Sequence, residues 1–324
     1  MKAAFLDFAT LGPNDIDTAD LQAVLPEIIF YEHTSVGELS ARVQDVEILL
    51  VNKVVLGTEQ LKKATALKLI GLAATGTDNV DLAAAAAQGV VVSNIRDYCT
   101  PSVVQHVFAL ILALNQHLAE YKQLTASGQW ARARQFCMHD HPFAELSGKT
   151  IGIVGYGALG RAVAEIAKGF GMNVLAAALS YRSTTEDEDG VERVRLEELL
   201  SRADITSLHC PLTSATRHLM NAATLALMPA HALLINTARG GLVDGDALVA
   251  ALKNGALGGA GIDVLTPEPP AVDAALLNAE LVNLIVTPHI AWAAREARQR
   301  ALDEITQNIK AFIAGKPRNQ VNPF

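Results

Sequence analysis

Residues 150–170 read TIGIVGYGALGRAVAEIAKGF, and this stretch decides the fold. TIGIV has the length and composition of a buried strand, and RAVAEIAKGF has the composition of a helix. Glycines between them form the pattern GxGxxG, which permits a tight turn, close approach of a pyrophosphate and close packing of helix on strand. Because the motif lies between a strand and a helix, it predicts dinucleotide binding rather than an ordinary glycine-rich turn. The loop expected to contact the cofactor comprises Gly155, Gly157, Ala158, Leu159 and Gly160.

Strand-length apolar runs alternate with helical patterns on both sides of this motif, as in parallel βαβ units. The first series is KAAFL at 2–6, EIIF at 27–30, EILLV at 47–51, LKLIGL at 67–72 and VVVS at 90–93. The second series is TIGIV at 150–154, NVLAA at 173–177, ITSLH at 205–209, ALLINT at 232–237, GAGIDV at 259–264 and LIVTPH at 284–289. Each series can close its own sheet, so the sequence predicts an α/β protein with two doubly wound domains rather than one eightfold barrel.

Two helical segments frame the second series. One apolar-periodic helix is expected from Thr100 to about Leu124, with Thr100 as N-cap and Pro101 as the first helical residue. A second helical segment follows His289 and ends at Gly315. A domain boundary is placed at Thr100.

Composition limits the possible partners. The 324 residues include 26 Lys and Arg against 34 Asp and Glu, for a net charge of −8, which argues against nucleic acid. Residues 98–119 and 219–238 lack formal charge, but polar residues interrupt both, so no membrane partner is expected. Three widely spaced cysteines fit neither a disulfide framework nor a paired metal site, and the first residues do not resemble a signal peptide. A cytoplasmic protein is expected.

The choice between NAD and NADP stays open. An acid that binds the adenosine ribose is expected about 20 residues after the glycines, but Ala178 occupies that position. Arg182 and Ser183, which follow it, could hold a 2′-phosphate. The acidic run at 186–189 would repel that phosphate if it folded back, although such runs are usually solvated loops.

Polar side chains follow four strands of the second series, at the ends where a doubly wound sheet places its ligands. These are His209, Arg239, Asp263 and His289, and Glu268 lies in the loop after the Asp263 strand. Reduction of a 2-oxo acid needs a proton donor for the carbonyl oxygen and a cation for the carboxylate. Histidine suits the first role and the guanidinium fork of arginine suits the second.

The chain resembles the D-isomer-specific 2-hydroxyacid dehydrogenases over essentially its whole length, through VGYGALG, SLHCPLT, LLINTARGGLVD, GGAGIDVLTPEPP and VTPHIAW in that order. The resemblance implies that Arg239 binds the substrate, that His289 is the general acid/base and that Glu268 pairs with it. It implies NAD(H) or NADP(H) as cofactor and no catalytic metal. Further cofactor contacts are implied for His209, Cys210, Pro211, Thr237, Ala238 and Asp263, besides Arg182 and Ser183 named above for a 2′-phosphate.

The resemblance also implies a discontinuous, flavodoxin-like substrate domain of residues 1–99 and 293–324, with the Rossmann cofactor domain at 100–292. The implied substrate contacts are the loop residues Ala74, Thr75 and Gly76, together with Asn52 and Trp292. The loop could equally be an ordinary turn with Asp78 or Asn79 as a helix N-cap, and Trp292 could equally serve only to pack a hinge helix.

Within the family, YCTPSVVQHVFALILAL, GQW at 128–130, FC at 136–137 and HIAW are similar to the glycerate dehydrogenase or hydroxypyruvate reductase branch. Hydroxypyruvate and glyoxylate are therefore the expected substrates. The alternatives are another 2-hydroxy acid, such as phosphoglycerate, or a non-catalytic protein that senses NAD(H). A homodimer is implied, with His106 in the core or at the interface. His139 and His141 lack a third metal ligand of recognisable spacing.

Overall fold

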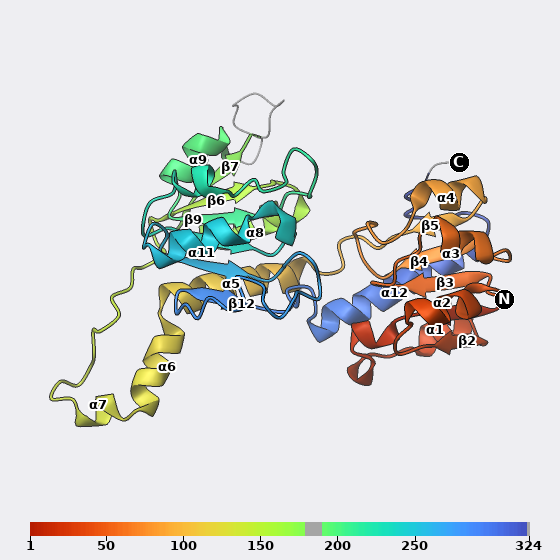
Figure 1. The fold of residues 1–324 in the computed structure, drawn as a ribbon, viewed down its shortest axis with the longest axis horizontal. Coiled ribbons are helices and arrows are strands. Elements are labelled where there is room, and N and C mark those ends of the chain that lie inside the picture. Colours follow the sequence, from red (N-terminus) through yellow and green to blue (C-terminus); the bar gives the residue numbers. More distant parts are fainter. Residues whose placement is uncertain (179–189, 323–324) are drawn as a thin grey trace. The chain divides into compact units, whose positions relative to one another are not determined.

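The computed structural model describes residues 1–178 and 190–322, and the chain divides into two compact units. Unit 1 consists of Met1–Cys99 and Trp292–Phe324, and unit 2 consists of Thr100–Ala291. Each unit contains one parallel sheet with helices on its faces (Figure 1). The expected α/β class with two doubly wound sheets is confirmed.

Unit 1 is built on a five-stranded parallel sheet in the order β2-β1-β3-β4-β5, the flavodoxin-like order. Helices α1 and α12 cover one face, and α2, α3 and α4 cover the other. Strands β3 and β4 are buried on both faces, which explains their unbroken apolar runs. The bounds are β1 Ala3–Phe5, α1 Ala19–Val24, β2 Ile28–Phe30, α2 Val36–Val43, β3 Ile48–Val51, α3 Thr58–Lys63, β4 Leu69–Leu72, α4 Leu82–Ala87, β5 Val91–Ser93 and α12 Arg295–Ile313.

Unit 2 is built on a seven-stranded parallel sheet in the order β12-β11-β10-β9-β6-β7-β8. Its bounds are α5 Thr100–Asn115, α6 Leu118–Ala126, α7 Gln129–Arg132, β6 Thr150–Val154, α8 Ala158–Gly169, β7 Asn173–Ala177, β8 Glu192–Val194, α9 Leu196–Arg202, β9 Ile205–Leu208, α10 Ala222–Leu225, β10 Leu233–Asn236, α11 Gly245–Lys253, β11 Gly259–Ile262 and β12 Leu284–Val286. The expectation of six strands was wrong by one. Strand β8 escaped detection because it is short and lies at the edge, where charged residues are tolerated.

The long helix expected from Thr100 to Leu124 is also corrected. Helix α5 ends at Asn115, and α6 continues at a bend of 55°. His117 causes the break, because its left-handed φ of 50° ends the helical path. Helices α6 and α7 then extend away from the sheet of unit 2 (Figure 1). Among the described residues, no single helix is long and apolar enough to cross a membrane, and only the bent pair α5 and α6 meets that test together.

The glycine motif forms the predicted strand–loop–helix connection from β6 to α8. Gly155 has a φ of 101°, and a Cβ there would lie 2.4 Å from the backbone nitrogen of Cys210 after β9. A Cβ at Gly160 would lie 2.3 Å from the carbonyl oxygen of Gly155. These two glycines therefore let the loop pack against the β9 connection and against its own helix, and not only against a cofactor.

We predict that Gly155→Ala lowers the free energy of unfolding by about 2 to 4 kcal/mol, because the methyl group meets backbone atoms and φ is positive. Chemical denaturation measures this change. Gly169→Ala is the matched control, since Gly169 lies in α8 with nothing within 4 Å of its added Cβ. That control should change stability by no more than about 1 kcal/mol, in the stabilising direction. Equal destabilisation by both substitutions would contradict the account.

Candidate active site

The polar side chains singled out in unit 2 follow β9, β10, β11 and β12 at one edge of the sheet. They share this edge because the strands are parallel, so that all their carboxyl ends face the same way. The glycine loop follows β6 at the same edge, because β6 pairs in parallel with β9. The topology therefore places a dinucleotide loop and the candidate catalytic residues on the same side of unit 2.

Asp263 organises the last part of this edge. Its side chain is 1% exposed and accepts hydrogen bonds from the Thr287 hydroxyl at 2.5 Å and from the backbone N–H groups of Ile290 and Ala291 at 2.9 Å each. Its carbonyl oxygen accepts the N–H of His289 at 2.7 Å. A buried carboxylate is stable only with such donors. Asp263 therefore fixes the segment that carries His289.

His106 adds to this network from helix α5. Its Nε2 lies 3.0 Å from the Thr287 hydroxyl oxygen and 3.5 Å from Asp263 Oδ1. His106 was expected only in the core or at an interface, so this contact was not predicted. Residues of α5 and β12 lie far apart in the chain, so no local pattern connects them.

His289 and Glu268 form a direct pair. His289 Nδ1 lies 2.6 Å from Glu268 Oε2, while Glu268 Oε1 accepts the backbone N–H of Leu265 at 2.9 Å. The side chains are 26% and 33% exposed, so a ligand can reach the pair. With Nδ1 facing the carboxylate, Nε2 is the ring nitrogen that can exchange a proton with a substrate.

Arg239 is presented by a short loop after β10. The Asn236 side chain donates to the carbonyl oxygen of Arg239 at 2.9 Å and accepts the N–H of Ala238 at 3.0 Å. A Cβ at Gly240 would lie 2.2 Å from the carbonyl carbon of Leu265, so this loop packs tightly against the segment that leads to Glu268. Asn236 was not predicted, although a buried asparagine at a strand end is a signal for such a loop.

His209 follows β9 beside the glycine loop. Its backbone N–H donates to Val154 at 2.7 Å, and its Nε2 lies 2.8 Å from the Ser207 hydroxyl. Burial lowers the pKa of His209 to about 4, so its ring is neutral at pH 7. Burial also raises the pKa of the Cys210 thiol. Neither side chain is therefore a ready proton donor or nucleophile at this edge.

In unit 1, Asn52 follows β3 and is held by a residue that the sequence analysis missed. Asp7 accepts the backbone N–H groups of Asn52 at 2.9 Å, Lys53 at 2.5 Å and Val54 at 2.9 Å. The Asn52 side chain donates to the Thr10 hydroxyl at 2.9 Å. Asn52 is 3% exposed, and the turn that it begins is fixed by one buried carboxylate.

The loop of Ala74, Thr75 and Gly76 follows β4. The Thr75 hydroxyl donates to the Ile95 carbonyl oxygen at 3.0 Å, and Asn94 Nδ2 donates to the Thr75 carbonyl oxygen at 2.8 Å. These bonds hold the loop against the β5 connection.

The expected N-cap at Asp78 or Asn79 is corrected. Asp81 caps α4 by accepting the N–H of Ala84 at 2.9 Å. The Asn79 side chain instead donates to the carbonyl oxygen of Val54, in the segment after β3, at 3.0 Å. It therefore links two loops of unit 1 and does not cap α4. Helix α4 therefore begins at Leu82, a few residues later than predicted, because Asp81 is the residue whose side chain reaches the N–H groups of the first turn.

Trp292 packs against the core of unit 1. Its ring lies edge-on to Tyr98, with centroids 6.4 Å apart. This contact accounts for a packing role of the side chain, and its substrate role stays a prediction. Arg182 and Ser183 lie outside the described residues.

The chain matches the family model "D-isomer specific 2-hydroxyacid dehydrogenase, NAD binding domain" over residues 108–291. The chain belongs to the D-isomer-specific 2-hydroxyacid dehydrogenase family. This confirms the resemblance read from the sequence, and with it the assignment as an NAD(P)-dependent oxidoreductase that acts on a CH–OH group.

Named relatives cover almost the whole chain. A glycerate dehydrogenase of Methylorubrum extorquens is 45% identical over 313 residues, covering 94% of this chain and 97% of the relative. A hydroxypyruvate reductase of Blautia hydrogenotrophica is 38% identical, covering 99% of this chain and 100% of the relative. The structure of an acyclic imino acid reductase in complex with NADPH and D-Arg superposes with a TM-score of 0.86 at 30% identity, covering 99% of this chain and 100% of that chain.

The residues of unit 2 fit a nicotinamide dinucleotide. Gly157, the N-cap of α8, has nothing within 4 Å of an added Cβ. Among the described residues, the buried Thr237 hydroxyl after β10 has no hydrogen-bond partner within the protein. A buried polar atom of this kind indicates a partner from outside the chain. The loop would hold the pyrophosphate, and Thr237 and Ala238 would contact the nicotinamide.

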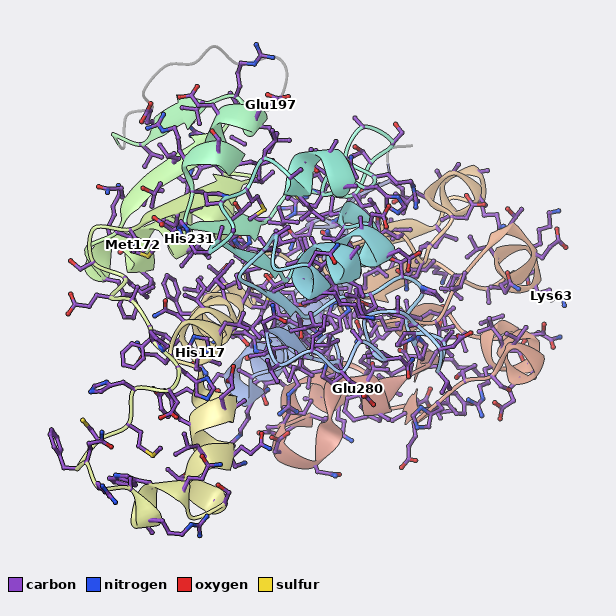
Figure 2. All side chains as sticks on the ribbon, turned by 60° about the vertical axis from the view of Figure 1, so that its left-hand side comes forward. Lys63, His117, Met172, Glu197, His231 and Glu280 are labelled. Carbon is purple, nitrogen blue, oxygen red and sulfur yellow. The ribbon has the colours of Figure 1, made fainter. Side chains whose placement is uncertain are left out.

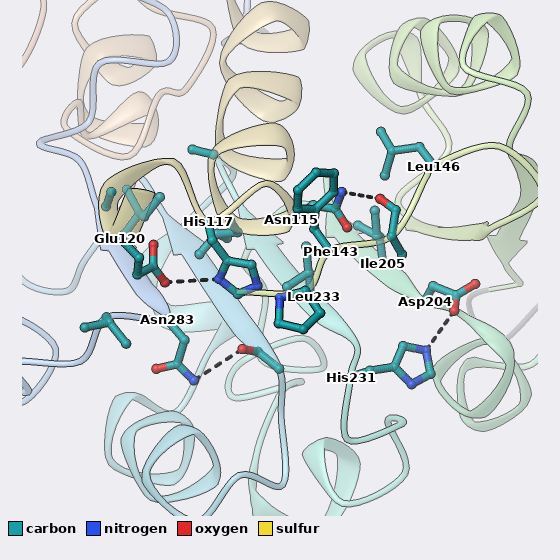
Figure 3. Close-up of a pocket in the computed structure, with 18 of the residues that line it drawn as sticks. Asn115, His117, Glu120, Phe143, Leu146, Asp204, Ile205, His231, Leu233 and Asn283 are labelled. Carbon is teal, nitrogen blue, oxygen red and sulfur yellow. Dashed lines mark hydrogen bonds and ion pairs between the residues drawn. The ribbon is translucent and has the colours of Figure 1, made fainter. Parts of the chain in front are cut away.

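A cavity of about 290 Å³ lies at the opposite edge of the unit 2 sheet (Figure 3). Asn115, His117, Phe143, Asp204 and His231 contribute to its lining. His231 Nε2 lies 2.7 Å from Asp204 Oδ1, but no described group of three His, Cys, Asp or Glu side chains could hold a metal ion. Because β9 and β10 begin at this edge, the cavity is separate from the His289–Glu268 pair.

We predict that the free energy of unfolding falls by up to about 3 kcal/mol as pH decreases from 6.5 to 4, owing to His209. In this window the unfolded chain binds a proton that folded His209 excludes, so the stability is complete above pH 6.5 and lost toward pH 4. Urea unfolding at several pH values measures the slope. His209→Gln should flatten it, whereas the exposed His33→Gln should not. An identical slope in both variants would refute the assignment.

Proposed function

We propose that the enzyme reduces hydroxypyruvate, and also glyoxylate, to the corresponding 2-hydroxy acid with NADH or NADPH. The observation that carries the proposal is the His289–Glu268 pair at 2.6 Å, with Nε2 directed away from the carboxylate, at the edge that also holds the glycine loop. The names of the glycerate dehydrogenase and hydroxypyruvate reductase relatives support this choice of substrate.

Reduction adds a hydride to C2 of the 2-oxo acid and a proton to its carbonyl oxygen. The nicotinamide cofactor supplies the hydride when bound. His289 donates the proton from Nε2, while Glu268 holds Nδ1 and stabilises the ring orientation. In the reverse direction the same nitrogen accepts the proton.

Arg239 binds the substrate carboxylate with its guanidinium fork, which holds the carbonyl carbon within reach of the hydride. The Asn236 hydrogen bonds support the loop that presents it. Residues 1–99 and 293–324, which lie in unit 1, are proposed as the substrate domain. Its contacts would be the backbone N–H groups of Ala74, Thr75 and Gly76, together with Asn52 and Trp292.

We predict that His289→Gln lowers kcat for hydroxypyruvate reduction by at least about 100-fold, the usual contribution of a general acid. NADPH oxidation at 340 nm measures the rate. His231→Gln is the control, since this exposed histidine lies at the opposite edge of the sheet. Turnover by His289→Gln within ten-fold of the wild type would refute the proton role. Absence of turnover by the wild type with every 2-oxo acid tested, including phosphohydroxypyruvate, would favour an NAD(H)-sensing protein.

We further propose that the enzyme is a homodimer that pairs through the segment from α6 to β6. Large apolar side chains are exposed there, with Leu118 at 55%, Trp130 at 53%, Phe136 at 89% and Phe143 at 56%. Figure 2 shows this segment extending below the sheet of unit 2, past the labelled His117. A second copy of the chain is the partner that would remove these side chains from water.

We expect the double variant Trp130→Ser and Phe136→Ser to shift the sedimenting mass toward the monomer, because it removes two of the three exposed aromatic side chains of the segment. Analytical ultracentrifugation at several concentrations measures this. Val272→Ser, at a side chain 91% exposed elsewhere in unit 2, should leave the dimer intact. A monomeric wild type would contradict the proposal.

A cytoplasmic location is proposed as well. Cys99, Cys137 and Cys210 are all free thiols, as is usual in a reducing compartment.

A further inference from the structure

The side chains of two arginines lie against the ring of Tyr156, a tyrosine of the glycine loop. Tyr156 lies between the first two glycines of the motif. The guanidinium carbon of Arg193, from β8, lies 4.3 Å from the centre of its ring, and that of Arg161, from the first turn of α8, lies 5.0 Å from it. Both distances are within the range of cation–π contacts. The Tyr156 ring therefore contacts the guanidinium groups of both arginines beside the glycine loop.

This group of Tyr156, Arg161 and Arg193, here called the arginine pair, lies beside the end of β7. Arg193 is in register with Ala176 of that strand, and the backbone N–H of Ala178 donates to Val194 at 2.8 Å. The end of the second strand is where a carboxylate binds the ribose 2′-OH in NAD-specific folds. Here the position is Ala178, and Arg193 on the neighbouring strand is in register with Ala176, two residues before it.

The described acid on β8 does not face the arginine pair. Side chains alternate along a strand, so Glu192 and Val194 point to the face opposite Arg193. Val194 packs with α9, and Glu192 forms an ion pair with Arg202 of α9 at 2.8 Å. That ion pair holds the carboxylate on the α9 side, whereas Arg193 lies on the α8 side with Tyr156.

We propose that Arg161 and Arg193, held against Tyr156, bind the 2′-phosphate of NADP(H) and give the enzyme a preference for NADPH. Guanidinium groups pair with phosphate through two parallel hydrogen bonds, and a ring that orients them reduces the entropy lost on binding. The proposal rests on the cofactor site of the proposed dehydrogenase. It assigns the choice between NADH and NADPH to Arg161 of α8 and Arg193 of the edge strand β8, which Tyr156 of the glycine loop positions.

The direct test compares 2′,5′-ADP with 5′-AMP, which differ only by the 2′-phosphate, in calorimetric titrations of the purified protein. The wild type should bind 2′,5′-ADP at least about ten-fold more tightly, the effect of one hydrogen bond to a charged group. Arg161→Gln with Arg193→Gln should abolish the difference and leave 5′-AMP binding within about two-fold. Arg195→Gln is the matched control, because its exposed side chain lies on the same edge next to Glu197.

Variants of Tyr156 test whether the position of the two guanidinium groups matters in addition to their charge. Tyr156→Ala keeps both cations but removes the ring, and it should reduce the preference for 2′,5′-ADP several-fold. Tyr156→Phe keeps the ring and should retain it. A wild type that binds both nucleotides equally, or a double arginine variant with an unchanged preference, would overturn the proposal. Because neither probe contains nicotinamide or a 2-oxo acid, this result is independent of whether hydroxypyruvate is the substrate.

Discussion

The buried carboxylate of Asp263 is the constraint on which the candidate active site depends. It is almost fully removed from water, so it requires hydrogen-bond donors, and the chain supplies them from residues 287–291. The same segment carries His289, whose backbone has a left-handed φ of 55°. The cost of that conformation is offset by the bonds around it. These bonds fix the backbone of His289, so that its imidazole ring is in place for the hydrogen bond with Glu268.

Parallel topology explains why the remaining parts meet. Each strand of unit 2 ends at the same edge, so residues separated by more than a hundred positions become neighbours of one loop. Gly155 and Gly240 tighten this arrangement, because each allows backbone to pack where a methyl group would collide with a neighbouring loop. The cavity at the other edge is lined neither by the glycine loop nor by the His289–Glu268 pair. The chemistry of the side chains, and not the size of a cavity, therefore locates the site.

Much of the fold could be predicted because long apolar strands and the glycine motif are strong local signals. The sequence did not predict β8, which is a three-residue edge strand, or the break at His117, which depends on one backbone angle. The pairing of His289 with Glu268 was predicted, and the structure shows it; the catalytic roles of His289, Glu268 and Arg239 stay predictions. The contacts of His106 with Thr287 and of Asp7 with the turn at Asn52 were not predictable, since each joins residues far apart in the chain. The hydrogen bonds of Asn236 are local and were not predicted, although a buried asparagine at a strand end is a signal for them.

His289 is proposed to exchange the proton on the oxygen of the substrate carbonyl, whose carbon receives the hydride. The most direct measurement is a crystal structure of the enzyme with NADP⁺ and an unreactive 2-oxo acid analogue such as oxamate. The account predicts that the analogue's carbonyl oxygen lies about 2.6 to 3.2 Å from His289 Nε2, with its carboxylate on Arg239. An analogue bound with its carbonyl oxygen facing another side chain, out of hydrogen-bond reach of His289, would contradict it.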